Sequence, residues 1–116
     1  MSLNGVWVLE VASVYGWERI STAFLENGRY LGGNANFFSQ GSYSSKGKNV
    51  DISLNITRHS GNLTVFGEKQ EQFSVEFSGK KKKNNMIKGH IRLKNAHSSV
   101  ASYPTRFVRL ADIVKK

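Results

Sequence analysis

The sequence predicts an all-β protein, an eight-stranded antiparallel up-and-down barrel, and two observations support this prediction. First, residues 50–57, 72–78 and 87–94 alternate apolar and polar side chains with a period of two. Such alternation buries one set of side chains and exposes the other, because successive strand residues point to opposite faces. Second, turn residues separate the apolar stretches at hairpin spacing, and no segment has a convincing helical pattern.

The other strands follow from weaker patterns at residues 6–12, 17–25, 36–43 and 103–110. Residues 6–12 are apolar on both faces except at Glu10. Asn27-Gly28 is a strong hairpin signal, because both residue types accept positive φ. Pro104 lies near the start of the last strand, where a missing N–H is tolerated. Together these segments predict about eight short strands.

About eight antiparallel strands on one core close most simply into an up-and-down barrel, which has no open edge. A two-sheet sandwich is the alternative. The length of 116 residues suits one domain that spans residues 1–116, and we expect residues 111–116 to form a frayed tail. An eight-stranded barrel is either filled by side chains or holds one small ligand.

The core is expected to contain the apolar side chains of the strands. These are Val8, Phe24, Phe38, Ile52, Leu54, Ile56, Phe73, Val75, Phe77, Ile91, Leu93 and Phe107. The pattern leaves the placement of Trp7 and Trp17 open. If the interior contains a cavity, its expected lining is Phe24, Phe38, Ile52, Leu54, Phe73, Phe77 and Phe107.

Positive charge is concentrated in the last third of the chain. The net charge is +9, yet residues 1–78 are close to neutral, and Asp112 is the one acidic residue after them. The run Lys80-Lys81-Lys82-Lys83 supplies much of the excess. Such a field attracts nucleic acid, anionic lipid or an acidic protein surface. The alternative is a surface that only keeps the protein soluble and protects strand edges.

Several function classes have little support in the residues. The chain has no cysteine, and His59, His90 and His97 lack the spacing of metal ligands. No Gly-x-Ser-x-Gly motif is present, and the carboxylates are scattered. We therefore expect no enzyme activity, no metal and no cofactor. No apolar run reaches the length of a membrane-spanning helix and no convincing signal peptide is visible, so we expect a cytoplasmic protein without a membrane partner.

Nucleic-acid binding has partial support. The lysine run would supply phosphate contacts only. Sequence-tolerant binding of a single strand also requires exposed aromatic rings on a sheet face. Phe37, Phe38 and Tyr43 are the candidates for such rings, but a place in the core is the more ordinary interpretation of these residues.

A series of short motifs suggests a family. In chain order they are Asn4-Gly5-Val6-Trp7, Glu26-Asn27-Gly28-Arg29, Gly32-Gly33-Asn34, Phe37-Phe38, Gly41-Ser42-Tyr43, Arg58-His59, Val65-Phe66-Gly67, Gly79, Gly89 and Phe107-Val108-Arg109-Leu110. Their order and spacing over residues 4–110 resemble the GrlR-like family, named for a negative regulator of type III secretion genes. The resemblance implies a lipocalin-like (calycin) eight-stranded barrel with an apolar interior, often dimeric.

The resemblance also implies action by protein–protein contact. The named regulator sequesters a transcriptional activator through an acidic tetrad in a loop between two middle strands. The corresponding loop here, residues 44–51, is basic through Lys46 and Lys48 and has one acid, Asp51, at its end. A basic loop would repel a surface built for the acidic tetrad. Asn34 replaces an Asp common in the family, and an amide can still cap a turn.

Three functions are therefore expected in decreasing order. The first is a GrlR-like regulatory or binding protein, expected to be a homodimer, that contacts an acidic protein partner through Lys46, Lys48, Lys80, Lys81, Lys82 and Lys83. The second is a carrier that holds a small apolar ligand inside the barrel. The third is a basic barrel that binds nucleic acid.

Overall fold

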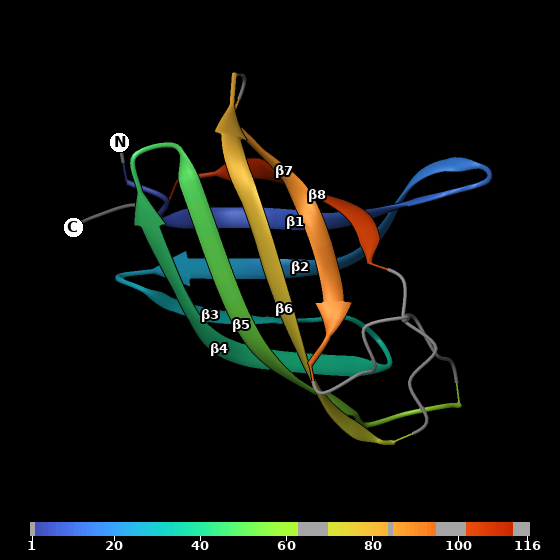
Figure 1. The fold of residues 1–116 in the computed structure, drawn as a ribbon. Coiled ribbons are helices and arrows are strands. Elements are labelled where there is room, and N and C mark those ends of the chain that lie inside the picture. Colours follow the sequence, from blue (N-terminus) through green and yellow to red (C-terminus); the bar gives the residue numbers. More distant parts are fainter. Residues whose placement is uncertain (1, 63–69, 84, 95–101, 113–116) are drawn as a thin grey trace.

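A computed structural model of the chain describes residues 2–62, 70–83, 85–94 and 102–112. In these ranges the chain forms a closed antiparallel barrel in which each strand pairs with the next and β8 returns to pair with β1 (Figure 1). The strands are β1 (Gly5–Ser13), β2 (Gly16–Glu26), β3 (Arg29–Gly33), β4 (Phe37–Lys46), β5 (Asn49–Arg58), β6 (Gln72–Lys82), β7 (Met86–Leu93) and β8 (Tyr103–Ala111). The predicted up-and-down barrel is confirmed, and the sandwich alternative is wrong.

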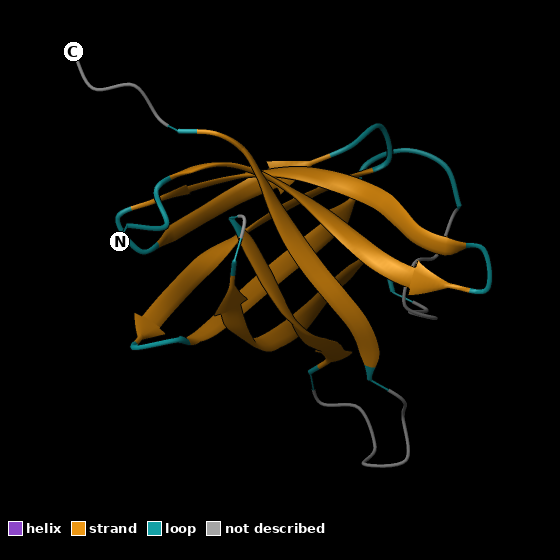
Figure 2. Cartoon of the chain, turned by 90° about the horizontal axis from the view of Figure 1, so that it is seen from above, coloured by secondary structure: helices purple, strands orange, loops and turns teal. Residues whose placement is uncertain are grey.

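The described residues contain strands and loops and no helix (Figure 2). None of their segments is therefore a helix long and apolar enough to cross a membrane. Ala111, which we expected in a frayed tail, is the last residue of β8. Residues 113–116 of that tail, His97 and the family motif at residues 65–67 lie outside the described residues.

Local turn chemistry explains two of the hairpins. Asn27 and Gly28 both have positive φ, 52° and 85°, so the predicted hairpin between β2 and β3 is present. Between β3 and β4, the side-chain oxygen of Asn34 accepts hydrogen bonds from the backbone N–H groups of Asn36 and Phe37, each at 2.8 Å. The amide of Asn34 therefore stabilises the turn by its own local hydrogen bonds.

Aromatic rings fill the centre of the barrel. Phe107 of β8 is fully buried, and its ring meets Phe77 at 5.0 Å and Tyr30 at 6.1 Å between centroids, both edge to face. Such edge-to-face contacts add stability beyond the burial of area. The expected core residues that are buried inside are Ile52, Leu54, Ile56, Phe73, Val75, Phe77, Ile91 and Phe107.

Two expected core residues lie outside the barrel instead. Phe24 is 51% exposed and Phe38 is 42% exposed, so neither lines the interior. The reason is strand alternation: Leu25, adjacent to Phe24, is fully buried, and Phe37, adjacent to Phe38, is 5% exposed. Where two neighbouring residues are both apolar, only one of them can face inward.

The other expectations for the core need smaller adjustments. Val8 is buried, but alternation between Trp7 and Leu9 places it on the outer side of β1, beside Val108 and Thr22. Leu93 is only partly buried at the edge of the core.

The two tryptophans, whose placement the sequence left open, have different environments. Trp7 belongs to the interior, where it is 1% exposed. Trp17 lies half-buried outside, with the Arg106 guanidinium 4.3 Å from its ring centroid.

Among the described residues, the interior space that their side chains enclose is small. One cavity, of about 30 Å³, lies between Leu9, Ile20, Ser21, Ser39, Leu54 and Phe73, among others. Sites for drug-sized ligands have volumes of roughly 300–1,000 Å³. A cavity of this size has room for about one or two water molecules.

The inward and outward positions of two phenylalanines predict different effects on stability. We expect Phe107→Ala to lower the free energy of unfolding by about 3–5 kcal/mol, because it leaves a cavity among packed rings. Phe24→Ala should lower it by less than about 1 kcal/mol, because its ring is half in solvent. Urea denaturation at low protein concentration measures both. Equal losses for the two variants would contradict the inside and outside assignment.

Candidate functional site

The up-and-down topology gathers the lysines at one end of the barrel. The turns β2–β3, β4–β5 and β6–β7 lie at the same end of the barrel as the start of β1 and the end of β8, because each strand reverses the direction of the previous one. The N-terminus and the β4–β5 and β6–β7 turns occupy the left and the top of Figure 1. We call this end of the molecule the basic end.

The six lysines predicted as a partner-binding surface all lie at the basic end. Lys46 and Lys48 flank the β4–β5 turn, whose Gly47 has a φ of 61°. The backbone N–H of Lys81 donates to the carbonyl of Lys48 over 2.8 Å, which joins this turn to the end of β6. In the run of residues 80–83, three lysines are exposed and Lys81 is half-buried.

No carboxylate in the described ranges forms an ion pair with any of these six lysines. Their charges therefore remain available to a partner. In contrast, Lys94 and Arg92 on the opposite half of the molecule both face Glu76 at 3.8 Å.

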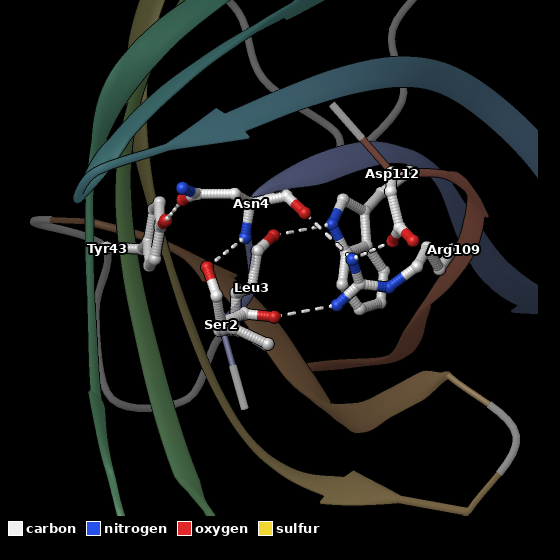
Figure 3. Close-up of polar contacts among 7 residues, drawn as sticks. Ser2, Leu3, Asn4, Tyr43, Arg109 and Asp112 are labelled. Atoms are coloured by element: carbon white, nitrogen blue, oxygen red, sulfur yellow. Dashed lines mark hydrogen bonds and ion pairs between the residues drawn. The ribbon is translucent and has the colours of Figure 1, made fainter. Parts of the chain in front are cut away.

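The N-terminal segment Ser2–Asn4 closes the basic end. The Trp7 indole N–H donates to the Leu3 carbonyl at 2.9 Å, and Leu3 is buried as part of the core (Figure 3). The Arg109 guanidinium donates to the carbonyls of Asn4 and Ser2 at 2.7 and 2.9 Å (Figure 3). Tyr43 donates its hydroxyl hydrogen to the Asn4 side chain. The N-terminal segment therefore covers the end of the barrel core beside the lysines.

Arg109 connects this closure to the core. Its guanidinium lies over the Trp7 ring at 4.6 Å and also pairs with Asp112 at 2.8 Å (Figure 3). Gly5 leaves room for it, since an added Cβ at Gly5 would meet the Arg109 Nη1 at 2.9 Å and the Ala111 carbonyl at 2.8 Å. A side chain at position 5 would displace either the arginine or the last strand.

Part of the outer wall of the barrel is apolar. Phe24 lies between Val6 and Leu31 in the strand register, and Leu110 lies in the β8 bulge opposite Val6. Leu31 and Leu110 are 57% and 50% exposed. We call Val6, Phe24, Leu31 and Leu110 the apolar wall.

The opposite part of the outer wall is polar. The outward side chains of β4, β5 and β6 line an open depression of about 280 Å³, and they include Ser42, Ser44, Asp51, Ser53, Glu76 and Ser78. Ser78 donates a hydrogen bond to Asp51, and Lys94 donates one to Ser53. This polar part of the outer surface contrasts with the apolar wall, where the outward side chains are hydrophobic.

Glu10 forms the most buried ion-pair cluster of the outer wall. Its side chain is 7% exposed and contacts Arg106 at 2.6 Å and Arg19 at 3.0 Å. Burial acts to raise the pKa of the Glu10 carboxyl, but the hydrogen bonds and charges of Arg106 and Arg19 outweigh it, so the pKa lies below its ordinary value. Arg106 also stacks on Trp17, so the cluster links β1, β2 and β8.

The two histidines that the structure describes lie on the outer surface, apart from each other. The His59 ring stacks on Phe38 and lies 3.3 Å from the Asn34 carbonyl, and His90 is exposed on the outer face of β7. Within the described residues, no three His, Asp or Glu side chains lie close enough to hold a metal ion.

The fold and its surface define a class of protein: a closed eight-stranded up-and-down barrel, the architecture of calycins, with a filled centre and a basic end. No protein-family model matches the chain, and no curated protein gives a significant match.

The sequence located some parts of this site and missed others. The lysine run and the basic residues of the Lys46-Gly47-Lys48 turn were identified from the sequence. The two segments lie close together because alternate turns of an up-and-down barrel share one end. The roles of Arg109 and Glu10 were missed, because each depends on contacts between distant strands. Glu10 left a signal, since it is the one charged residue in an otherwise apolar strand.

The depressed pKa of Glu10 predicts a pH-dependent contribution to stability. The ionised carboxylate stabilises the fold at pH values above the unfolded pKa of about 4.5, and this contribution is lost as the pH falls through the lower folded pKa. We expect Glu10→Gln to lower the free energy of unfolding by about 2 kcal/mol at pH 7. The difference from the wild type should shrink towards pH 3, as measured by urea denaturation.

Glu76→Gln is the matched control. The Glu76 side chain is 38% exposed and its two cations are 3.8 Å away, so the loss should stay below about 1 kcal/mol. A wild-type-to-Glu10→Gln difference that is constant from pH 7 to pH 3 would show that the charge of Glu10 is not what stabilises the barrel.

Proposed function

We propose that this chain is a non-enzymatic, cytoplasmic regulatory protein of the GrlR-like kind, which acts by contact with an acidic protein partner. The observation that carries the proposal is the convergence of Lys46, Lys48 and the run of residues 80–83 at the basic end. Complementary charge speeds association and rejects partners of the wrong sign. The resemblance of the motifs over residues 4–110 supports a regulatory role through protein contact.

The sign of the charge on this surface distinguishes the chain from the regulator after which the family is named. That protein presents acidic residues from the loop between two middle strands, whereas here the β4–β5 turn presents Lys46 and Lys48. The partner should therefore be acidic and differ from the partner of the named regulator.

Two further observations favour an acidic protein over the alternatives. The outward residues of β5 and β6 next to the lysines include Asp51, Ser78 and Glu76, which offer no aromatic platform on which bases could stack. For a carrier of a small apolar ligand, the described cavity of about 30 Å³ is too small.

The test replaces the six lysines by glutamine. We expect the wild-type protein to capture acidic proteins from a lysate of the native cells, and the six-glutamine variant to capture at least ten-fold less. Circular dichroism checks that the variant is folded, and Lys88→Gln/Arg92→Gln removes two other outward cations as a control. If the six-glutamine variant captures as much acidic protein as the wild type, the proposal is wrong. Binding of a single-stranded oligonucleotide at about 50 mM salt would favour nucleic acid instead.

We also propose that the chain forms a homodimer through the apolar wall. Exposed apolar patches on a folded protein mark interaction sites more often than isolated exposed residues do. The charges beside the wall nearly cancel, since Glu26 is next to Arg29 and the Glu10 carboxylate pairs with both Arg19 and Arg106, which leaves a net charge of +1 on these five groups. Two copies that each carry +9 repel least where their facing surfaces are neutral and apolar.

Size-exclusion chromatography with light scattering tests the dimer. The wild type should have twice the monomer mass of 13.0 kDa, and Phe24→Ser/Leu31→Ser should weaken association roughly hundred-fold and give a monomer. Val14→Ser/Tyr15→Ser is the matched control, because these side chains are also exposed but lie on the β1–β2 turn at the other end. A monomeric wild type at high protein concentration contradicts the proposal.

A further inference from the structure

A cleft opens at the basic end between the N-terminal segment and the β6–β7 hairpin. Its volume is about 220 Å³. Leu3, Met86 and Ile87 supply apolar lining, and Lys81, Lys82 and Lys83 supply cationic lining. The cleft therefore combines an apolar and a cationic surface in one place.

The strand register explains this combination. Lys82 faces Met86 and Lys81 faces Ile87 across the β6–β7 pair, so each lysine has an apolar residue beside it. Met86 is half-buried, and its unbranched, flexible side chain can adapt to the shape of an incoming group. Lys81 is half-buried, and a lysine can bury its alkyl stem while its ammonium group stays in solvent.

Arg109 adds a fixed cation to the lining of the same cleft. Its side chain is 9% exposed and is oriented by the carbonyls of Ser2 and Asn4. Its Nε–H is buried and has no acceptor in the described part of the chain. Because Asp112 already pairs with Arg109, the cationic charge that remains available at the cleft comes from the lysines, and Arg109 holds the wall of the cleft in place.

We propose that this cleft anchors an apolar side chain of the acidic partner segment, with the acidic residues on either side of that side chain facing Lys81, Lys82 and Lys83. The inference rests on the proposed function and adds the chemistry of the ligand: an acidic peptide with an apolar residue at its centre. A purely acidic surface would use the lysines and leave the half-buried Met86 uncovered. A nucleic acid would use the lysines without an apolar anchor.

Met86 provides a direct spectroscopic probe of binding in the cleft. The chain has two methionines, and Met86 is the one in the cleft. Labelling the methionine methyl groups with carbon-13 therefore gives one resonance that reports on the cleft and one from residue 1. Three synthetic twelve-residue peptides serve as ligands: one rich in Glu with a central Leu, the same peptide with Ser for Leu, and the Leu peptide with Gln for every Glu.

We expect the acidic Leu peptide to shift the Met86 resonance and to bind about ten-fold more tightly than the acidic Ser peptide, because it buries an apolar side chain. The Gln peptide should not bind measurably. Met86→Gln should remove the preference for Leu over Ser while leaving the affinity for the Ser peptide unchanged.

Two double variants with the same net charge distinguish binding in the cleft from non-specific electrostatic attraction to the basic end. Lys81→Gln/Lys83→Gln and Lys46→Gln/Lys48→Gln each remove two positive charges, but only the first pair lines the cleft. The first pair should weaken binding of the acidic Leu peptide several-fold more than the second.

The outcomes distinguish the cleft from the proposed function. If the Leu and Ser peptides bind with equal affinity and the Met86 resonance does not shift, the proposal of an apolar anchor in the cleft is wrong, while the proposal of an acidic partner stands. Failure of both acidic peptides to bind at about 50 mM salt overturns the acidic partner as well. Binding of a single-stranded oligonucleotide that shifts Met86, without binding of either peptide, replaces both proposals with nucleic-acid recognition.

Discussion

The pairing of β8 with β1 is the constraint on which the rest of this structure depends. It closes the sheet, and a closed sheet has one inside and one outside. Leu9 faces Phe107 across this pairing, so the ring of Phe107 enters the centre and meets rings from β3 and β6. The same pairing aligns Trp7 with Arg109 and Glu10 with Arg106. The pairing of β8 with β1 is therefore stabilised by aromatic packing inside the barrel and by ion pairs on its outer surface.

Closure also decides where charge and apolar surface are presented. In an up-and-down barrel alternate turns share an end, so lysines that lie more than thirty positions apart in the chain become neighbours at the basic end. The N-terminal segment covers that end through Trp7 and Arg109, which turns a possible opening into a surface. The apolar wall lies on the side of the barrel formed by β8, β1, β2 and β3. An acidic partner and a second copy of the chain could thus bind at the same time without competing for the same residues.

The core was predictable where the strands alternate strictly and ambiguous where they do not. In β5, Ile52, Leu54 and Ile56 alternate with polar residues, and all three are buried. In β2 and β4, adjacent apolar residues fit either phase, and the choice of Phe24 and Phe38 was wrong. The phase of such a strand is decided by its register with neighbours, here Val6 and Leu31 for Phe24. The candidate site followed the same rule, since the lysines were found by composition but the cleft beside them depends on Leu3 and Arg109, which come from the two ends of the chain.

The amino-acid sequence alone determined the class of fold, most strands, the Asn27-Gly28 hairpin and the basic residues, because these depend on local periodicity, turn propensity and charge. Tertiary structure alone decided that the interior is filled, that Phe24 and Phe38 face outward, and that Glu10 sits between Arg19 and Arg106. These features depend on contacts between strands far apart in the chain. A local pattern specifies which side chains can be buried, and only closure of the sheet selects which of them share the limited space inside.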